Sequence, residues 1–227
     1  MAVAEARLPP AARSPARLTA WLTLVGLISV ANFVGNAESG PPKDFVYQWS
    51  SAISELIYAV VLIAIVLAIA GLRDVRGMFA LRRPRSWWRA LGLGALLIMV
   101  TYVFVGALSP ILQPGEEQGL TPNGWDSSRA AQFVVNFVAI AFVVPIVEEL
   151  TFRGVGFTLL RRFGEAVAVV GVGVAFALVH GIPEGLPVFA LFGGGLAYIR
   201  SRSESVYPGM VVHGLFNGLG LILAVVT

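Results

Sequence analysis

The chain has 227 residues, of which 57% are hydrophobic and 13% charged, and its mean hydropathy is +0.80. A soluble domain carries about 25% charged and about 45–50% apolar residues, so this composition excludes a water-soluble enzyme and a disordered chain. The absence of cysteine excludes a disulfide-stapled secreted scaffold. The 16 Lys and Arg residues outnumber the 13 Asp and Glu residues. In so apolar a chain this excess indicates loop orientation in a membrane rather than nucleic-acid binding.

Apolar segments long enough to cross a bilayer recur along the whole chain. A spanning helix needs about 20 mostly apolar residues. The sequence therefore predicts an all-α polytopic membrane protein, with a cytoplasmic N-terminal tail over residues 1–17 and one transmembrane domain over 18–227. Seven spans are expected, at residues 18–34, 54–72, 90–108, 128 to beyond Pro145, 166–180, 182–199 and 206–226.

The basic residues between these spans fall almost entirely on one side. Cytoplasmic loops are enriched in Lys and Arg, so the distribution predicts a cell-membrane protein with a cytoplasmic N-terminus and an external C-terminus. The apolar stretch before Gly35 also fits a cleaved signal peptide, which would leave the orientation of the remainder unchanged. One side would hold Arg7, Arg13, Arg17, Arg73, Arg76, Arg82, Arg83, Arg85, Arg89, Arg161, Arg162, Arg200 and Arg202, and the other only Lys43 and Arg129.

A few ionisable residues lie where orientation cannot explain them. Charged side chains near the bilayer centre cost at least about 2.5–3.5 kcal/mol each on insertion scales, so they indicate function by default. Glu148, Glu149 and Arg153 fall within one apolar run. The two histidines of the chain, His180 and His213, lie within or at the end of later spans.

The spacing along the chain allows these groups to meet. If the fourth helix continues to a turn at Gly164, Glu148 and His180 each lie 16 residues from that turn, at a depth of about 24 Å. His213 and Asn217 lie at about 17–22 Å along the last span, measured from the basic pair that precedes it. Polar groups from three helices are therefore expected at one level in the membrane.

The charges within the first cluster suggest a division of roles. Glu149 and Arg153 are four residues apart with the acid first, the favourable order for a helical ion pair. Their pairing leaves Glu148 as the uncompensated carboxylate, which can act as a base toward water with His180 as its partner. His213 and Asn217 can both donate to an oxygen that develops negative charge.

These residues resemble the three motifs of the CAAX-protease and bacteriocin-processing (CPBP) family, the Abi group of intramembrane glutamic proteases. The resemblance covers about residues 130–226 and implies an eight-helix fold with a motif-bearing catalytic core at about 128–226. It implies hydrolysis of a peptide bond by water that the first Glu and first His activate, with the second His and the Asn as oxyanion hole. Its motifs are Glu148, Glu149 and Arg153, then Phe176 and His180, then His213 and Asn217.

Other functions remain open at the level of sequence. The expected partners are membrane lipids and a peptide or membrane-protein substrate, lipidated substrates included, with no nucleic acid. No cofactor is expected, although a zinc-dependent protease could use the same polar residues. A non-enzymatic scaffold or bacteriocin-immunity-type protein is the second alternative. A transporter would also place polar groups at mid-membrane, but no broken helix pair is visible in matching halves.

Overall fold

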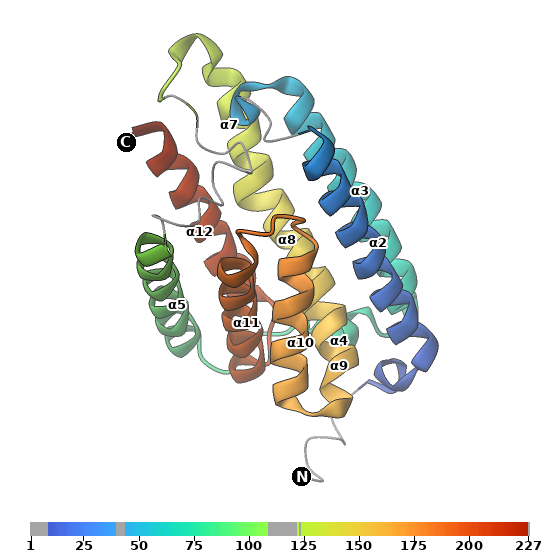
Figure 1. Ribbon diagram of the computed structural model, residues 1–227. Coiled ribbons are helices and arrows are strands. Elements are labelled where there is room, and N and C mark those ends of the chain that lie inside the picture. Colours follow the sequence, from blue (N-terminus) through green and yellow to red (C-terminus); the bar gives the residue numbers. More distant parts are fainter. Residues whose placement is uncertain (1–8, 40–43, 109–121, 123, 227) are drawn as a thin grey trace.

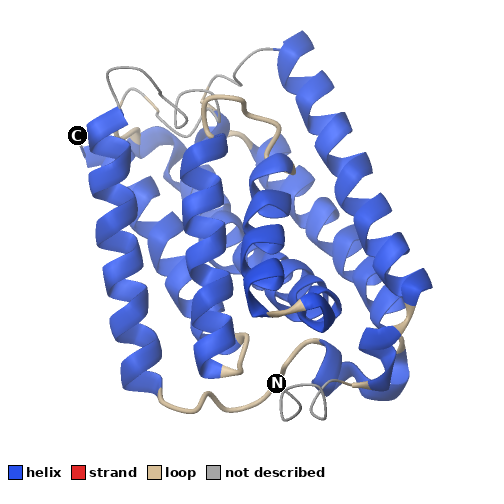
Figure 2. Ribbon diagram, turned by 60° about the horizontal axis from the view of Figure 1, so that its bottom comes forward, coloured by secondary structure: helices blue, strands red, loops and turns tan. Residues whose placement is uncertain are grey.

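The computed structural model describes residues 9–39, 44–108, 122 and 124–226. Within these ranges the regular structure is entirely helical, and no strand occurs (Figures 1 and 2). The predicted all-α class is therefore confirmed. The expected cytoplasmic tail lies partly outside the described residues.

The first half of the described chain contains three long helices. These are α2 (Pro15–Ser39), α3 (Trp49–Ala70) and α5 (Trp87–Leu108). Short helical turns precede or follow them: η1 (Pro10–Arg13), η2 (Phe45–Tyr47), η3 (Leu72–Asp74) and α4 (Val75–Met78).

A single helical path of 37 residues, Ser127–Phe163, carries the first motif. It is built from α7 (Ala130–Val138), the π-helix η5 (Ala139–Val143), α8 (Val144–Glu149), the π-helix η6 (Leu150–Gly156) and α9 (Phe157–Leu160), with the 3-10 turns η4 (Ser127–Arg129) and η7 (Arg161–Phe163) at its ends. Three further helices follow: α10 (Glu165–Leu178), α11 (Leu186–Ser203) and α12 (Tyr207–Val226).

Both ends of this long helix have identifiable local causes. Asp126 caps its start by accepting hydrogen bonds from Ser128 and Arg129, which lower the pKa of Asp126 to about 2. At the other end the backbone φ of Gly164 is 112°, a left-handed value that favours glycine. The helix therefore runs through Arg153 and turns at Gly164, as the spacing of the charged residues predicted.

Five helices of the described chain are long and apolar enough to cross a membrane. They are Pro15–Glu38, Trp49–Ala70, Trp87–Leu108, Ser127–Phe163 and Tyr207–Val226. The apolar helix α10 is shorter, with 14 residues. The predicted count of seven to eight spans is therefore not confirmed, although a multi-pass membrane protein is.

The predicted boundary between the fifth and sixth spans was misplaced. Helix α10 ends at Leu178, and α11 begins only at Leu186 and continues to Ser203, so Arg200 and Arg202 lie within α11 rather than in a loop. Hydropathy alone did not predict where α11 begins. Helix α11 begins there because it has a proline at its second position, where the missing backbone N–H is not needed.

The helices pack in an order that surrounds the long helix. Helices α10 and α11 lie side by side, α5 and α12 pack against α11, and α2 and α3 lie on the opposite side of the long helix (Figure 1). Helices α10 and α11 approach closely at Gly173, where an added Cβ would lie 2.9 Å from the backbone nitrogen of Gly194. Small residues of this kind allow helix backbones to approach one another within a bilayer.

Contacts between loops gather the basic residues at one end of the bundle. Glu204 accepts from Arg85 at 2.9 Å and lies 4.0 Å from Arg161, and Arg162 donates to the carbonyl of Arg13 at 2.9 Å. The ion pairs of Arg129 with Asp44 and Asp126 lie at the start of the long helix instead. This separation agrees with the sequence-based orientation, which remains a prediction.

Candidate active site

A buried ion pair joins the second glutamate of the first motif to its arginine. Arg153 donates through Nη1 to Glu149 Oε1 at 2.8 Å, and both side chains are fully buried. Its Nη2 donates to the carbonyl of Gly193 in α11, also at 2.8 Å. The predicted pairing of these two side chains is present. It also connects the long helix to α11, which the sequence did not indicate.

His213 of α12 lies between the two glutamates. Its Nδ1 is 3.2 Å from Glu149 Oε1, and its Nε2 is 3.7 Å from Glu148 Oε2. A carboxylate can only accept hydrogen bonds, so Nδ1 of His213 carries the proton when Glu149 is ionised. The other ring nitrogen then faces Glu148 across a gap longer than a hydrogen bond. Residues 64 positions apart thus form one buried polar cluster.

His180 lies next to this cluster but not on the helix that was predicted to carry it. Helix α10 ends at Leu178, and His180 occupies the turn that follows. Its Nδ1 lies 2.7 Å from the carbonyl oxygen of Phe176, which can only accept, so Nδ1 carries a proton and Nε2 of the neutral ring has a free lone pair. The imidazole also stacks on Phe189 at 4.1 Å.

Phe176 links the two histidines. Its ring centroid lies 4.7 Å from that of His180 and 5.6 Å from that of His213. The guanidinium carbon of Arg153 lies 4.3 Å from the same ring. Among the contacts of the described residues, none joins His180 directly to Glu148. The structure therefore brings the two histidines to one site, with Phe176 between them.

Asn217 lies one turn beyond His213 on α12. Its Nδ2 donates to the carbonyl of Ile140 at 3.0 Å, within the π-helix η5. This contact with the backbone was not expected for an oxyanion donor. An amide carries two N–H protons, so one remains available for another acceptor.

The two π-helical turns share a pattern of side-chain donors. A π-turn interrupts the regular α-helical ladder, and such turns are frequent at functional sites. In this chain three carbonyls within the turns accept hydrogen bonds from other helices. The donors are Asn217 to Ile140, Trp21 to Thr151 and Arg200 to Arg153, at 3.0, 3.1 and 3.2 Å.

Helix α3 contributes two residues that sequence reasoning did not assign. Glu55 and Tyr58 both interact electrostatically with Glu148, and with each other. Glu55 is a lone acid in an apolar span, so the criterion that selected Glu148 could also have found it.

The acidic and imidazole groups do not form a metal-ligand cluster. Within the described part of the chain, no three His, Cys, Asp or Glu side chains are arranged to hold a metal ion. Arg153 pairs with Glu149 in this cluster, and its positive charge would repel a cation. The residues present therefore do not fit a zinc centre.

Comparison with known proteins assigns a family to the part of the chain that holds these residues. Residues 130–219 match the family model of the Type II CAAX prenyl endopeptidases, Rce1-like. This region is similar to Rce1-like domains. It contains all three motifs, which confirms the resemblance seen in the sequence, and its family is one of membrane proteases. No curated protein and no solved structure matches the chain.

Proposed function

We propose that this chain is an intramembrane endopeptidase in which Glu148 activates water to hydrolyse a peptide bond. The observation that carries the proposal is the buried contact of Glu148 with His213, at 3.7 Å, from two helices far apart in sequence. Glu148 is the carboxylate that Arg153 leaves unpaired. A base that is buried beside an imidazole and an arginine suits proton transfer rather than structural pairing.

The proposed reaction assigns a role to each polar side chain. Glu148 takes a proton from water while the water oxygen attacks the carbonyl carbon of the substrate. The free Nε2 of His180 accepts a hydrogen bond from the second O–H of that water and so orients it, and this hydrogen stays on the oxygen. His213 and Asn217 donate to the tetrahedral oxyanion, and Glu149 stabilises His213 when both its nitrogens carry protons. Glu148 then returns its proton to the leaving amine as the C–N bond breaks.

The proposal also covers organisation and substrate. The catalytic core would span about residues 128–226 of one transmembrane domain that covers 18–227, after a cytoplasmic tail over 1–17. The substrate would be a peptide or a membrane protein, lipidated substrates included, cut at the cell membrane. These features rest on the Rce1-like match and on the distribution of basic residues.

Substitution of the base tests the proposal. Glu148→Gln keeps the shape of the side chain but removes the base, so we expect proteolysis to fall about 10²–10⁴-fold. The measurement compares cleavage products in native membranes that carry the wild type or the variant, by mass spectrometry, together with substrates that co-purify with the variant. Glu38→Gln, at an exposed position in α2, is the matched control. Full proteolysis by a folded Glu148→Gln protein would show that Glu148 is not the base, whereas no cleavage by either protein would favour the scaffold alternative.

A chelator separates the proposal from the zinc-dependent alternative. We expect purified protein to keep its activity after strong chelation and dialysis, because Arg153 already pairs with Glu149, one of the carboxylates that a cation would need. Loss of activity on chelation with recovery on addition of zinc would make the water-activating glutamate mechanism wrong.

A further inference from the structure

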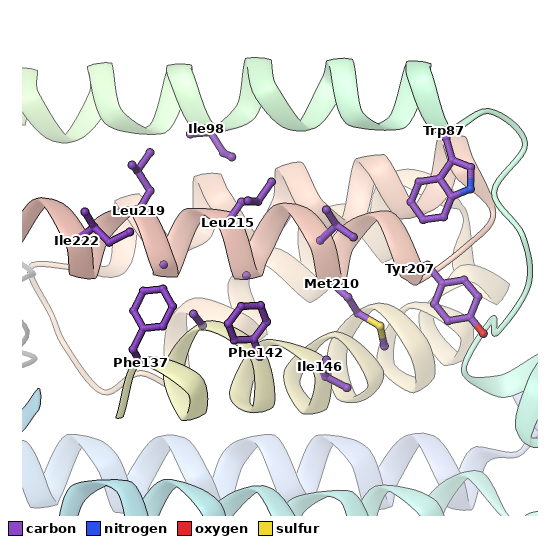
Figure 3. A pocket seen from close by; sticks show the side chains of 14 residues that line it. Trp87, Ile98, Phe137, Phe142, Ile146, Tyr207, Met210, Leu215, Leu219 and Ile222 are labelled. Carbon is purple, nitrogen blue, oxygen red and sulfur yellow. The ribbon is translucent and has the colours of Figure 1, made fainter. Parts of the chain in front are cut away.

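An apolar cavity lies beside the site, between α5 and α12, with η5 and α8 along its other wall. Its volume is about 840 Å³. The lining includes Trp87, Phe142, Tyr207, Leu215 and Ile222 (Figure 3). The indole of Trp87 and the phenol of Tyr207 are its polar side-chain groups, and both lie at the same end in Figure 3. Among the other described residues that line the cavity, no side chain could recognise a polar ligand.

The cavity is elongated along α12. Tyr207 and Ile222 lie at its two ends, 15 residues apart, so it extends about 22 Å at about 1.5 Å per residue. The cavity is therefore longer than one leaflet of the hydrocarbon core, which is about 15 Å thick, half of the whole core. Leu215 is 59% exposed and Leu219 is 42% exposed, so the cavity opens along its side. Its shape suits an extended chain that enters from the bilayer.

The end marked by Trp87 and Tyr207 carries a cluster of positive charge. Arginine and tryptophan at a membrane boundary are favourable partners for anionic headgroups, at about 1 kcal/mol per basic residue. Trp88, next to the cavity, is 87% exposed. The exposed arginines around the start of α5 are Arg82, Arg83, Arg85 and Arg89.

We propose that this groove binds one acyl chain of an anionic phospholipid, with the headgroup phosphate at the arginines around the start of α5. An extended peptide would leave its backbone N–H and C=O groups unpaired among apolar side chains. An acyl chain has no such groups.

The same groove reaches the backbone beside the catalytic residues. Gly214 and Gly218 line it, and they directly follow His213 and Asn217 on α12. Gly214 packs closely on the π-helix η5, since an added Cβ would lie 2.6 Å from the carbonyl oxygen of Ala141. A bound acyl chain would therefore stabilise α12 where it presents its polar residues. The inference concerns lipid binding and does not require the proposed catalytic roles.

Native mass spectrometry of the purified full chain tests this site. Phosphatidylglycerol and phosphatidylcholine with the same acyl chains are titrated into delipidated protein. We expect one phosphatidylglycerol to bind at least tenfold more tightly than phosphatidylcholine. Leu215→Trp fills the groove and should weaken binding of phosphatidylglycerol at least tenfold. Leu219→Trp is the second filling variant, should Leu215→Trp fail to fold. Leu27→Trp, at a 65% exposed position on α2, controls for an added indole.

Charge variants test where the headgroup lies. Arg89→Gln should reduce the preference for phosphatidylglycerol several-fold and leave phosphatidylcholine binding unchanged. Arg73→Gln, exposed in η3, makes the same charge change away from α5 and should have no effect. Unchanged binding in folded groove-filling variants, or equal effects of Arg89→Gln and Arg73→Gln, would overturn the proposal. So would tighter binding of a farnesylated peptide in the same groove, because the groove would then be a substrate site.

Discussion

At the scale of single residues, Glu149 connects the parts of the site. One carboxylate oxygen accepts both from Arg153 on its own helix and from His213 on α12. Glu149 thus neutralises the buried charge of Arg153, and it fixes the ring orientation of His213, the histidine that faces Glu148. A carboxylate that orients an imidazole through Nδ1 is a recurrent device in hydrolytic sites. Glu149 is therefore a positioning residue in the proposed mechanism.

The buried ion pair predicts a specific pattern of stability. Arg153→Met leaves Glu149 as an uncompensated buried charge, so we expect it to lower the free energy of unfolding by about 3–5 kcal/mol. The double variant Glu149→Gln with Arg153→Met removes both charges and should recover most of that loss. Denaturant titration in micelles measures both. Equal destabilisation of the single and double variants would show that the charge of Glu149 is not what Arg153 stabilises.

The residue scale is also where sequence reasoning selected most residues of the candidate site. Glu148, Glu149, Arg153 and His213 form one cluster because each is costly in a bilayer unless it has a partner. The detailed contacts were not predictable. His180 lies in a turn and bonds the backbone of Phe176, and Asn217 bonds the backbone of Ile140. Which acceptor a side chain finds depends on neighbours that local spacing does not specify.

At the scale of elements, the long helix is shaped by its two π-turns. Both lie close to the motif residues, η5 before Glu148 and η6 after Glu149. Their carbonyls accept donors from α2, α11 and α12, so the turns also connect helices. Sequence patterns did not indicate them, because a π-turn is stabilised by the partners that it meets in the folded chain.

The contact between α2 and η6 predicts a measurable cost. Trp21 is fully buried, and its indole N–H donates to the carbonyl of Thr151. Trp21→Phe removes that hydrogen bond, which we expect to cost about 0.5–1.5 kcal/mol of unfolding free energy, besides any loss of packing. Trp49→Phe, at a 50% exposed position on α3, should stay within about 0.5 kcal/mol.

An isosteric side chain separates the hydrogen bond from packing at this position. Benzothienylalanine at position 21 keeps the bicyclic shape but replaces the N–H with sulfur. The protein with this side chain should show most of the loss of unfolding free energy that Trp21→Phe causes. Wild-type stability with this side chain would assign the effect to packing alone.

At the scale of the whole molecule, the bundle separates charge along its axis. The loops that carry most arginines meet through Glu204 and the backbone of Arg13, whereas Arg129 pairs with Asp44 at the start of the long helix. The start of α2 and the end of α12 lie at opposite ends of the bundle (Figure 1). These features agree with a cytoplasmic N-terminus and an external C-terminus.

Cysteine labelling tests this orientation directly, because the chain contains no cysteine. Leu72→Cys lies beside the basic loops and Ser127→Cys at the start of the long helix, and both positions are exposed. We expect a membrane-impermeant maleimide to label Ser127→Cys in intact cells and Leu72→Cys only after permeabilisation. The reverse pattern would contradict the positive-inside assignment.

The sequence by itself determined that this is an all-helical, multi-pass membrane protein, and it selected the few residues of the candidate site. It did so because a bilayer penalises every charge and every unpaired backbone group, so apolar length and misplaced charge can be read locally. The tertiary structure decided that Glu149 accepts hydrogen bonds from both Arg153 and His213. It also decided that His180 lies beyond the end of α10, where its ring packs against Phe176. Such pairings depend on distances between helices, which follow from packing over the whole chain rather than from local spacing.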